Sequence, residues 1–134
     1  MPSEVLCDKG HRRYWYCRDA AIELSRDGKL AACDVEGCGH ARHYVVSHTY
    51  ANSEETHEYE LEKVARLYSD EEAEENQYDP MVFLLREKET GEKAIWPFFW
   101  AKDRNGHWRV GQFSPLFSVL DLEELLRSLQ VVVA

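Results

Sequence analysis

The cysteines and histidines of this 134-residue chain have the most specific chemistry in the sequence. Cys33 and Cys38 lie five positions apart in a glycine-containing segment, and Cys7 and His11 lie four positions apart in another. Zinc takes four sulfur or nitrogen ligands at tetrahedral corners, and proteins usually offer them as two close pairs on tight turns. The sequence therefore predicts a zinc site made by Cys7, His11, Cys33 and Cys38.

The identity of the fourth ligand stays open at this point. Cys17 would make an all-thiolate site, but no turn lies beside it, and a small thiol within a strand is commonly a core residue. His40 and His43 follow the last cysteine closely, and either could replace His11. We favour His11, because its spacing from the first cysteine forms a compact pair.

The pattern resembles the zinc ribbon class. Some ribbons have a first knuckle of the form Cys-x-x-Gly-His, then a β-hairpin, then a second knuckle of the form Cys-x-x-Cys-Gly. The chain matches at Cys7, Gly10, His11, Cys38 and Gly39, but the spacer of its second knuckle is four residues rather than two. The resemblance covers residues 5–48. It implies a zinc-stabilised module and names no function.

A structural metal is the expected one. A catalytic zinc keeps a position open for water and usually has histidine and carboxylate ligands, whereas several thiolates make the ion a poor Lewis acid. The sequence lacks the deaminase signature, a nucleophile elbow and a glycine-rich phosphate loop. We therefore expect a noncatalytic binding or regulatory protein. A metal-dependent hydrolase is the enzymatic alternative.

The negative charge is concentrated in the middle of the chain. The formal net charge is −9, and residues 51–92 contain fourteen acidic and four basic side chains. Such a segment repels DNA and attracts basic proteins. A protein partner is therefore expected, and one alternative is that the chain inhibits a basic nucleic-acid-binding protein by mimicking nucleic acid. A local nucleic-acid contact is the other alternative, through arginines that lie among aromatic residues: Arg12, Arg13, Arg18 and Arg42.

The ends and the hydropathy of the chain bear on its location. The first residues lack the basic start and apolar run of a signal peptide, and no apolar stretch approaches the roughly 18 residues of a membrane span. We expect a cytoplasmic protein without membrane contact. Thiols stay reduced there, which favours metal binding over disulfides.

The expected fold is α+β in three parts, which could also form one compact unit. Residues 1–50 would form a zinc-ribbon-like β-hairpin lobe, with strands at 13–24, 30–32 and 43–50. Residues 51–80 would form an acidic helical connector, with the helix at 53–75. Residues 81–134 would form a three-stranded antiparallel meander closed by a C-terminal helix, with strands at 81–88, 93–101 and 107–113.

Aromatic and leucine residues define the expected packing of the C-terminal part. In residues 95–101 both faces of the strand are apolar, with Trp96, Phe98 and Trp100 on one of them. One face is expected to pack beneath the C-terminal helix, and the other to meet the N-terminal half or a partner. That helix places four leucines on one stripe: Leu122, Leu125, Leu126 and Leu129.

Overall fold

The computed structural model describes residues 3–13, 17–49, 54–111 and 117–128. These residues form an α+β fold in which a single antiparallel sheet contains all the strands. The elements are β1 (Ser3–Cys7), β2 (Arg12–Arg13), α1 (Cys17–Asp27), β3 (Arg42–Thr49), β4 (Thr56–Arg66), α2 (Asp70–Asn76), β5 (Tyr78–Glu87), β6 (Lys93–Lys102), β7 (Trp108–Val110), β8 (Phe117–Ser118) and α3 (Val119–Ser128).

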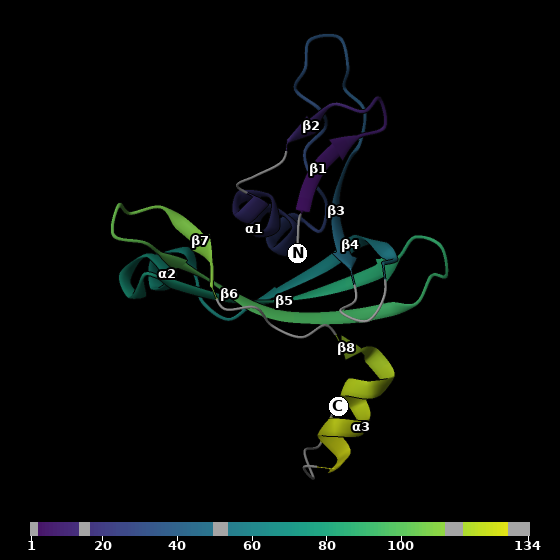
Figure 1. Cartoon of the computed structure of the whole chain (residues 1–134). Coiled ribbons are helices and arrows are strands. Elements are labelled where there is room, and N and C mark those ends of the chain that lie inside the picture. Colours follow the sequence, from purple (N-terminus) through teal and green to yellow (C-terminus); the bar gives the residue numbers. More distant parts are fainter. Residues whose placement is uncertain (1–2, 14–16, 50–53, 112–116, 129–134) are drawn as a thin grey trace.

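The strands follow the order β2-β1-β3-β4-β5-β6-β7, and β8 pairs with the beginning of β6. The pairings β3–β4 and β4–β5 continue the sheet across residues 50 and 80, so the ranges 1–50, 51–80 and 81–134 share it. Figure 1 shows β4, β5 and β6 as a curved sheet, with α1 and β1–β3 on one side and α3 on the other.

The core lies between α1 and the sheet. Ala21, Ile22 and Leu24 of α1 are buried against aromatic side chains of β3, β5 and β6. Phe83 is fully buried, and its ring meets that of Phe98 edge-to-face with centroids 4.5 Å apart. Aromatic pairs in this geometry add to the free energy gained by burying their surface. The β6 face that carries Trp96, Phe98 and Trp100 is therefore internal and meets the N-terminal half.

The strand predicted at residues 13–24 is wrong, because a helix begins at Cys17. Asp19 in the first turn and Arg26 in the last turn complement the helix dipole, and the apolar side chains gather on one side. The aromatic residues that favoured a strand lie at 14–16, outside the described residues. Residues 30–32, predicted as a return strand, have no regular structure.

The helix predicted at residues 53–75 is also wrong over most of its length, since residues 56–66 form β4. Tyr59 and Leu61 are buried on one face, as in any strand. A β-bulge between Leu61 and Lys63 then shifts the alternation by one, which turns Val64 toward the same core. The resulting three-residue spacing imitates a helix. Helix α2 starts only at Asp70, behind a capping box made by Ser69 and Glu72.

The predicted C-terminal meander corresponds to β5, β6 and β7, and the predicted helix to α3. The predicted closure by that helix is wrong, because α3 has no buried residue among those described and extends away from the sheet (Figure 1). Leu129 lies outside the described residues. None of the described helices is long and apolar enough to cross a membrane.

Candidate metal centre

The first half of the centre is a tight turn at the end of β1. The amide of Cys7 donates to the carbonyl of His11 at 3.0 Å, and the amide of Gly10 donates to the carbonyl of Cys7 at 2.9 Å. Gly10 has φ +88°, a conformation that side chains disfavour. The turn therefore brings the imidazole back beside the thiol, and His11 Nδ1 lies 3.3 Å from Cys7 Sγ.

The second half is the loop that precedes β3. The amide of Cys33 donates to the carbonyl of His40 at 2.9 Å, and the amide of Cys38 donates to the carbonyl of Val35 at 2.9 Å. These two bonds fold the spacer so that both sulfurs lie on one side. Antiparallel pairing of β1 with β3, in register at Cys7 and Arg42, then places the two turns side by side.

The four donor atoms lie close enough together to bind one metal ion. Sγ of Cys7, Cys33 and Cys38 and Nδ1 of His11 all lie within 4.8 Å of one another. The sulfurs of Cys7 and Cys38 are 3.8 Å apart, and His11 Nδ1 is 3.6 Å from the sulfur of Cys33. Zinc bonds of about 2.3 Å to sulfur and 2.0–2.1 Å to nitrogen imply tetrahedral edges of about 3.8 Å and 3.6 Å. The group could hold a metal ion.

Burial and hydrogen bonding make the thiols of this group unequal. Cys7 and Cys33 are buried, Cys38 is half-buried and His11 is exposed. Burial opposes ionisation of Cys7, but hydrogen bonds from the amides of His11 and Lys9 outweigh it and lower the pKa of its thiol to about 6. An amide hydrogen bond at His40 favours the thiolate of Cys38, yet burial and the neighbouring sulfurs raise its pKa. One thiolate is thus favoured at neutral pH, as metal binding requires.

The structure places the alternative ligands differently. Among the described residues, the only group of donors close enough for a metal is the one that contains His11. The ring nitrogens of His43 lie 2.7 Å from Glu60 and 2.8 Å from Asp8. Burial works against its protonation, but these two carboxylates raise its pKa, so His43 bridges Glu60 of β4 and Asp8 of the turn after β1. The side chain of Cys17 lies outside the described residues.

Two of the arginines proposed for nucleic acid, Arg18 and Arg42, are engaged by other residues of the chain. Arg18 points inward from α1 and its guanidinium lies 3.8 Å from the centre of the Trp108 ring. Arg42 pairs with Asp34 at 2.5 Å beside the second turn. The side chain of Arg13 is outside the described residues.

A buried ion cluster is the feature that sequence reasoning missed. Asp79 on β5 is fully buried and accepts hydrogen bonds from Arg18 of α1 and Arg66 of β4. Burial disfavours the charge of Arg66, but its hydrogen bonds to Asp79 and Asp70 raise its pKa. These residues are 61 and 13 positions apart from Asp79, so no local spacing could have indicated the cluster.

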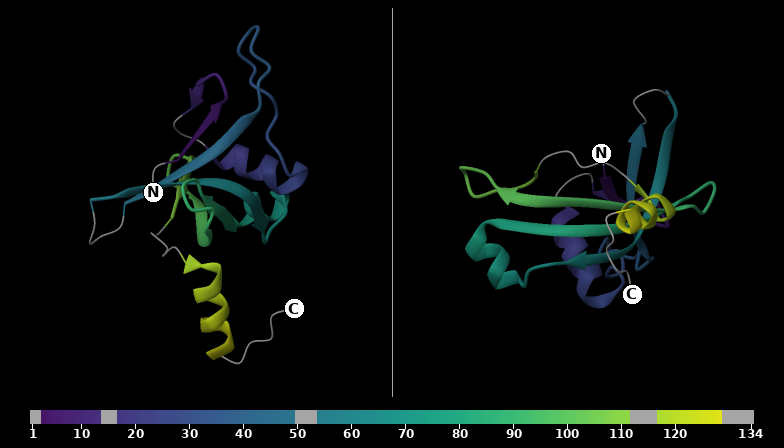
Figure 2. Two further views of the ribbon diagram at one scale, coloured as in Figure 1. Left: turned by 90° about the vertical axis from the view of Figure 1, so that its right-hand side faces the viewer. Right: turned by 90° about the horizontal axis from the view of Figure 1, so that it is seen from below.

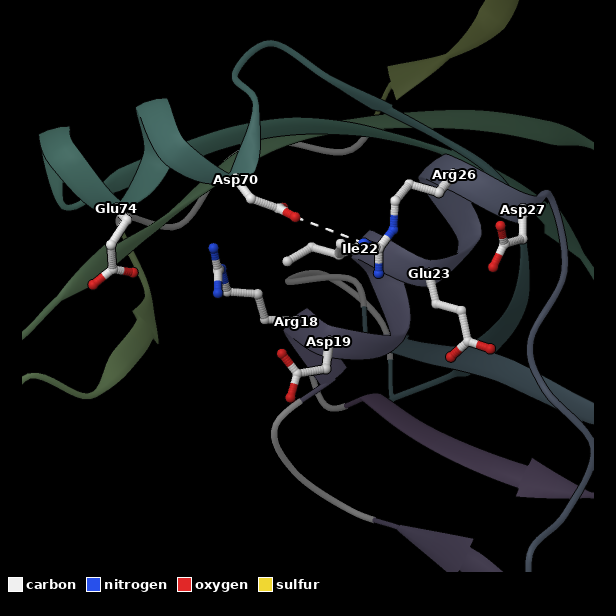
Figure 3. Close-up of a pocket in the computed structure, with 8 residues that line it drawn as sticks. All are labelled: Arg18, Asp19, Ile22, Glu23, Arg26, Asp27, Asp70 and Glu74. Carbon is white, nitrogen blue, oxygen red and sulfur yellow. Dashed lines mark ion pairs between the residues drawn. The ribbon is translucent and has the colours of Figure 1, made fainter.

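An open groove of about 570 Å³ lies beside this cluster, between α1 and α2 (Figure 3). Its lining is mostly acidic, and Arg26 spans it to reach Asp70 at 3.6 Å. Both side chains are more than half exposed, so this pair contributes little to stability.

Comparison of the chain with protein-family models, with curated proteins and with solved structures returns no match. The features that bear on function are therefore the candidate metal centre and the surfaces around it.

Proposed function

We propose that this protein is a zinc-stabilised binding or regulatory protein of the cytoplasm, which acts through macromolecular contacts and without catalysis. The observation that carries the proposal is the close grouping of one nitrogen and three sulfurs, from Cys7, His11, Cys33 and Cys38, within 4.8 Å of one another. Thiolate-rich tetrahedral sites are typical of structural zinc. The segment between the two turns contains α1, where a zinc ribbon would have a β-hairpin, so the proposal depends on the ligand set and not on the ribbon resemblance.

The number of ligands argues against a catalytic ion. Four protein side chains would fill the four positions of tetrahedral zinc, and catalysis needs one position for water or substrate. An ion at this position would instead tie β1 to the loop before β3. It would stabilise a part of the chain in which most of the side chains are exposed or half-buried.

The metal assignment predicts about one zinc per chain in protein purified without chelators, measured by elemental analysis. Cys33→Ser should lose zinc and lower the melting temperature, whereas Cys17→Ser, the matched control, should keep its zinc. Zinc-free protein that melts at the same temperature as zinc-loaded protein would contradict a structural role. Loss of zinc from the Cys17→Ser variant would assign the fourth position to Cys17.

A protein is the partner that the surface charges favour over nucleic acid. The net charge of −9 disfavours contact with phosphates. Many carboxylates of the acidic middle are already paired within the chain, since Glu62 binds Arg86 and Lys93, and Glu74 binds Lys102. This internal pairing weakens the alternative in which the segment mimics nucleic acid, because less of its charge is left for a basic protein.

Affinity purification of the full chain with its zinc retained tests the binding function. We expect a protein that is captured by the wild type and lost with Cys33→Ser. Nucleic acid that stays bound to the chain through washes at moderate salt would contradict a protein-directed function. Hydrolytic turnover that requires the metal would contradict the noncatalytic assignment.

A further inference from the structure

Helix α3 carries an apolar stripe in which no described residue is buried. Val119, Leu122, Leu125 and Leu126 lie within about 120° of one another on a helix with 3.6 residues per turn. Leu125 is 47% exposed, although an amphipathic helix normally buries such a stripe against its own domain. The helix begins where β8 pairs with β6, and the left view of Figure 2 shows it extending away from the sheet.

The sheet has a second apolar surface, on the side opposite α1, on which no described helix packs. We call it the outer face; it comprises residues of β5 and β6 that alternate with core residues: Val82, Leu84, Ile95, Pro97 and Phe99. Val82 pairs directly with Pro97, and Leu84 with Ile95, so these side chains form a continuous patch. Val82 is 38% exposed and the others are half-buried. Contiguous apolar patches of this kind mark interaction sites.

The two surfaces match in size. From Val119 to Leu126 the stripe rises about 10 Å, at 1.5 Å per residue. From Ile95 to Phe99 the outer face extends about 13 Å, at roughly 3.3 Å per residue. The stripe of one helix therefore covers most of the length of the patch.

The surfaces also have opposite charge. The described residues of α3 include three acidic side chains and one basic one. The outer face is bordered by three basic residues, Lys63, Arg86 and Lys93; Arg86 pairs with Glu60 and Glu62, and Lys93 pairs with Glu62. The border is therefore net positive while the helix is net negative, and a helix laid on this face meets charges of opposite sign.

We propose that a second copy of this chain occupies the outer face, so that two chains exchange their α3 helices across a twofold axis. Each chain carries both halves of the contact, and the twofold arrangement buries two stripes and two outer faces at once. A stable dimer needs roughly 800 Å² from each partner, and exchange of both surfaces doubles what a single helix provides. The proposal does not depend on the metal or on the proposed function.

The first test is the mass of the zinc-loaded full chain in solution, measured by sedimentation over a concentration series. We expect a dimer for the wild type. Leu125→Asp should raise the dissociation constant at least about 100-fold, because each dimer loses two buried leucines, at about tenfold or more for each. Leu120→Asp is the matched control: it introduces the same change on the same helix, but Leu120 is 75% exposed and lies off the stripe, so the dimer should persist.

A mixing experiment separates exchange of helix and face from contact between two helices. Val82→Lys places a charge on the outer face, and we expect this variant to be monomeric, like Leu125→Asp. An equimolar mixture of the two should dimerise more tightly than either alone, because one intact stripe then meets one intact outer face. Circular dichroism and zinc content identify a variant that misfolds, and the other variant then still tests the proposal.

Three results would overturn the proposal. One is a wild-type chain that is still monomeric at a concentration 100-fold above a micromolar dissociation constant. That result would leave the outer face to a different protein. Another is an equal loss of self-association in Leu120→Asp and Leu125→Asp. The third is a dimer that tolerates both Leu125→Asp and Val82→Lys.

Discussion

Replacement of Asp79 by asparagine tests how much of the fold depends on its buried ion cluster. Asp79 is 0% exposed and accepts four hydrogen bonds, from Nε and Nη2 of Arg18 at 3.1 and 2.9 Å and from Nε and Nη2 of Arg66 at 2.9 Å each. The side chains of the two arginines are only 13% and 8% exposed. Asparagine keeps the shape of the side chain but has one carbonyl oxygen, so its amide group would face a guanidinium.

The magnitude follows from these contacts. Asp79→Asn loses about two charge-assisted hydrogen bonds, worth roughly 1.5–3 kcal/mol each, and leaves a buried cation without its counter-ion. Removing one partner of a buried ion pair costs about 3–5 kcal/mol. We expect the free energy of unfolding to fall by that amount. A chain of this length has a stability of about 7–20 kcal/mol, so the loss is a large fraction of it.

Equilibrium urea unfolding of the zinc-loaded protein measures this change. Asp70→Asn is the matched control, since Asp70 also binds Arg66 but its side chain is 58% exposed. We expect that variant to lose less than about 1 kcal/mol. Similar losses in the two variants, or a loss below about 1 kcal/mol for Asp79→Asn, would show that the cluster is not buried as described.

Two further predictions concern pH and packing. The ion pair of His57 with Glu87, at 2.6 Å, lowers the pKa of the carboxyl and raises that of the imidazole. The contribution of this pair to the free energy of unfolding is therefore complete only between about pH 4.3 and pH 6.5, the unfolded-state pKa values of glutamate and histidine. It is lost as pH falls through the lowered pKa of Glu87 or rises through the raised pKa of His57. Melting temperature against pH should flatten in Glu87→Gln, and an unchanged profile would count against the pair. Gly111→Ala should cost about 1–3 kcal/mol, because the added Cβ would meet the Phe99 ring at 1.9 Å. Combination with Phe99→Ala should remove that extra cost in urea unfolding, and additive losses would indicate another cause.

The grouping of Cys7, His11, Cys33 and Cys38 could be predicted from the sequence, because most of the information for it is local. Two turns with fixed short spacings bring Cys7 to His11 and Cys33 to Cys38, and both pairs were indicated by residue type and glycine placement. Strands could be predicted where apolar and polar residues alternate without interruption, as in β5 and β6. At β4 the bulge beside Lys63 produced a helical spacing within a strand.

Elements that depend on distant partners could not be predicted. Helix α1 is held by its buried side against the sheet, and tertiary packing outweighs the local propensity of its surroundings. Asp79 appeared in the sequence as one acidic residue among many, and only the approach of Arg18 and Arg66 distinguishes it. The outward direction of α3 depends on how β8 joins β6, which its leucine pattern does not determine.

The order of the strands has a consequence for how the chain assembles. From β3 to β7 every strand pairs with its neighbour in sequence, so each hairpin closes a short loop and can form early. The pairing of β1 with β3 joins residues nearly forty positions apart and encloses α1 and both halves of the metal centre. We expect this edge to be the last part of the sheet to form and the first to open in native-state hydrogen exchange. If the proposed zinc is bound, its release would then detach β1 and β2 while the strands from β3 to β7 stay paired, so the chain would keep its central sheet without the ion.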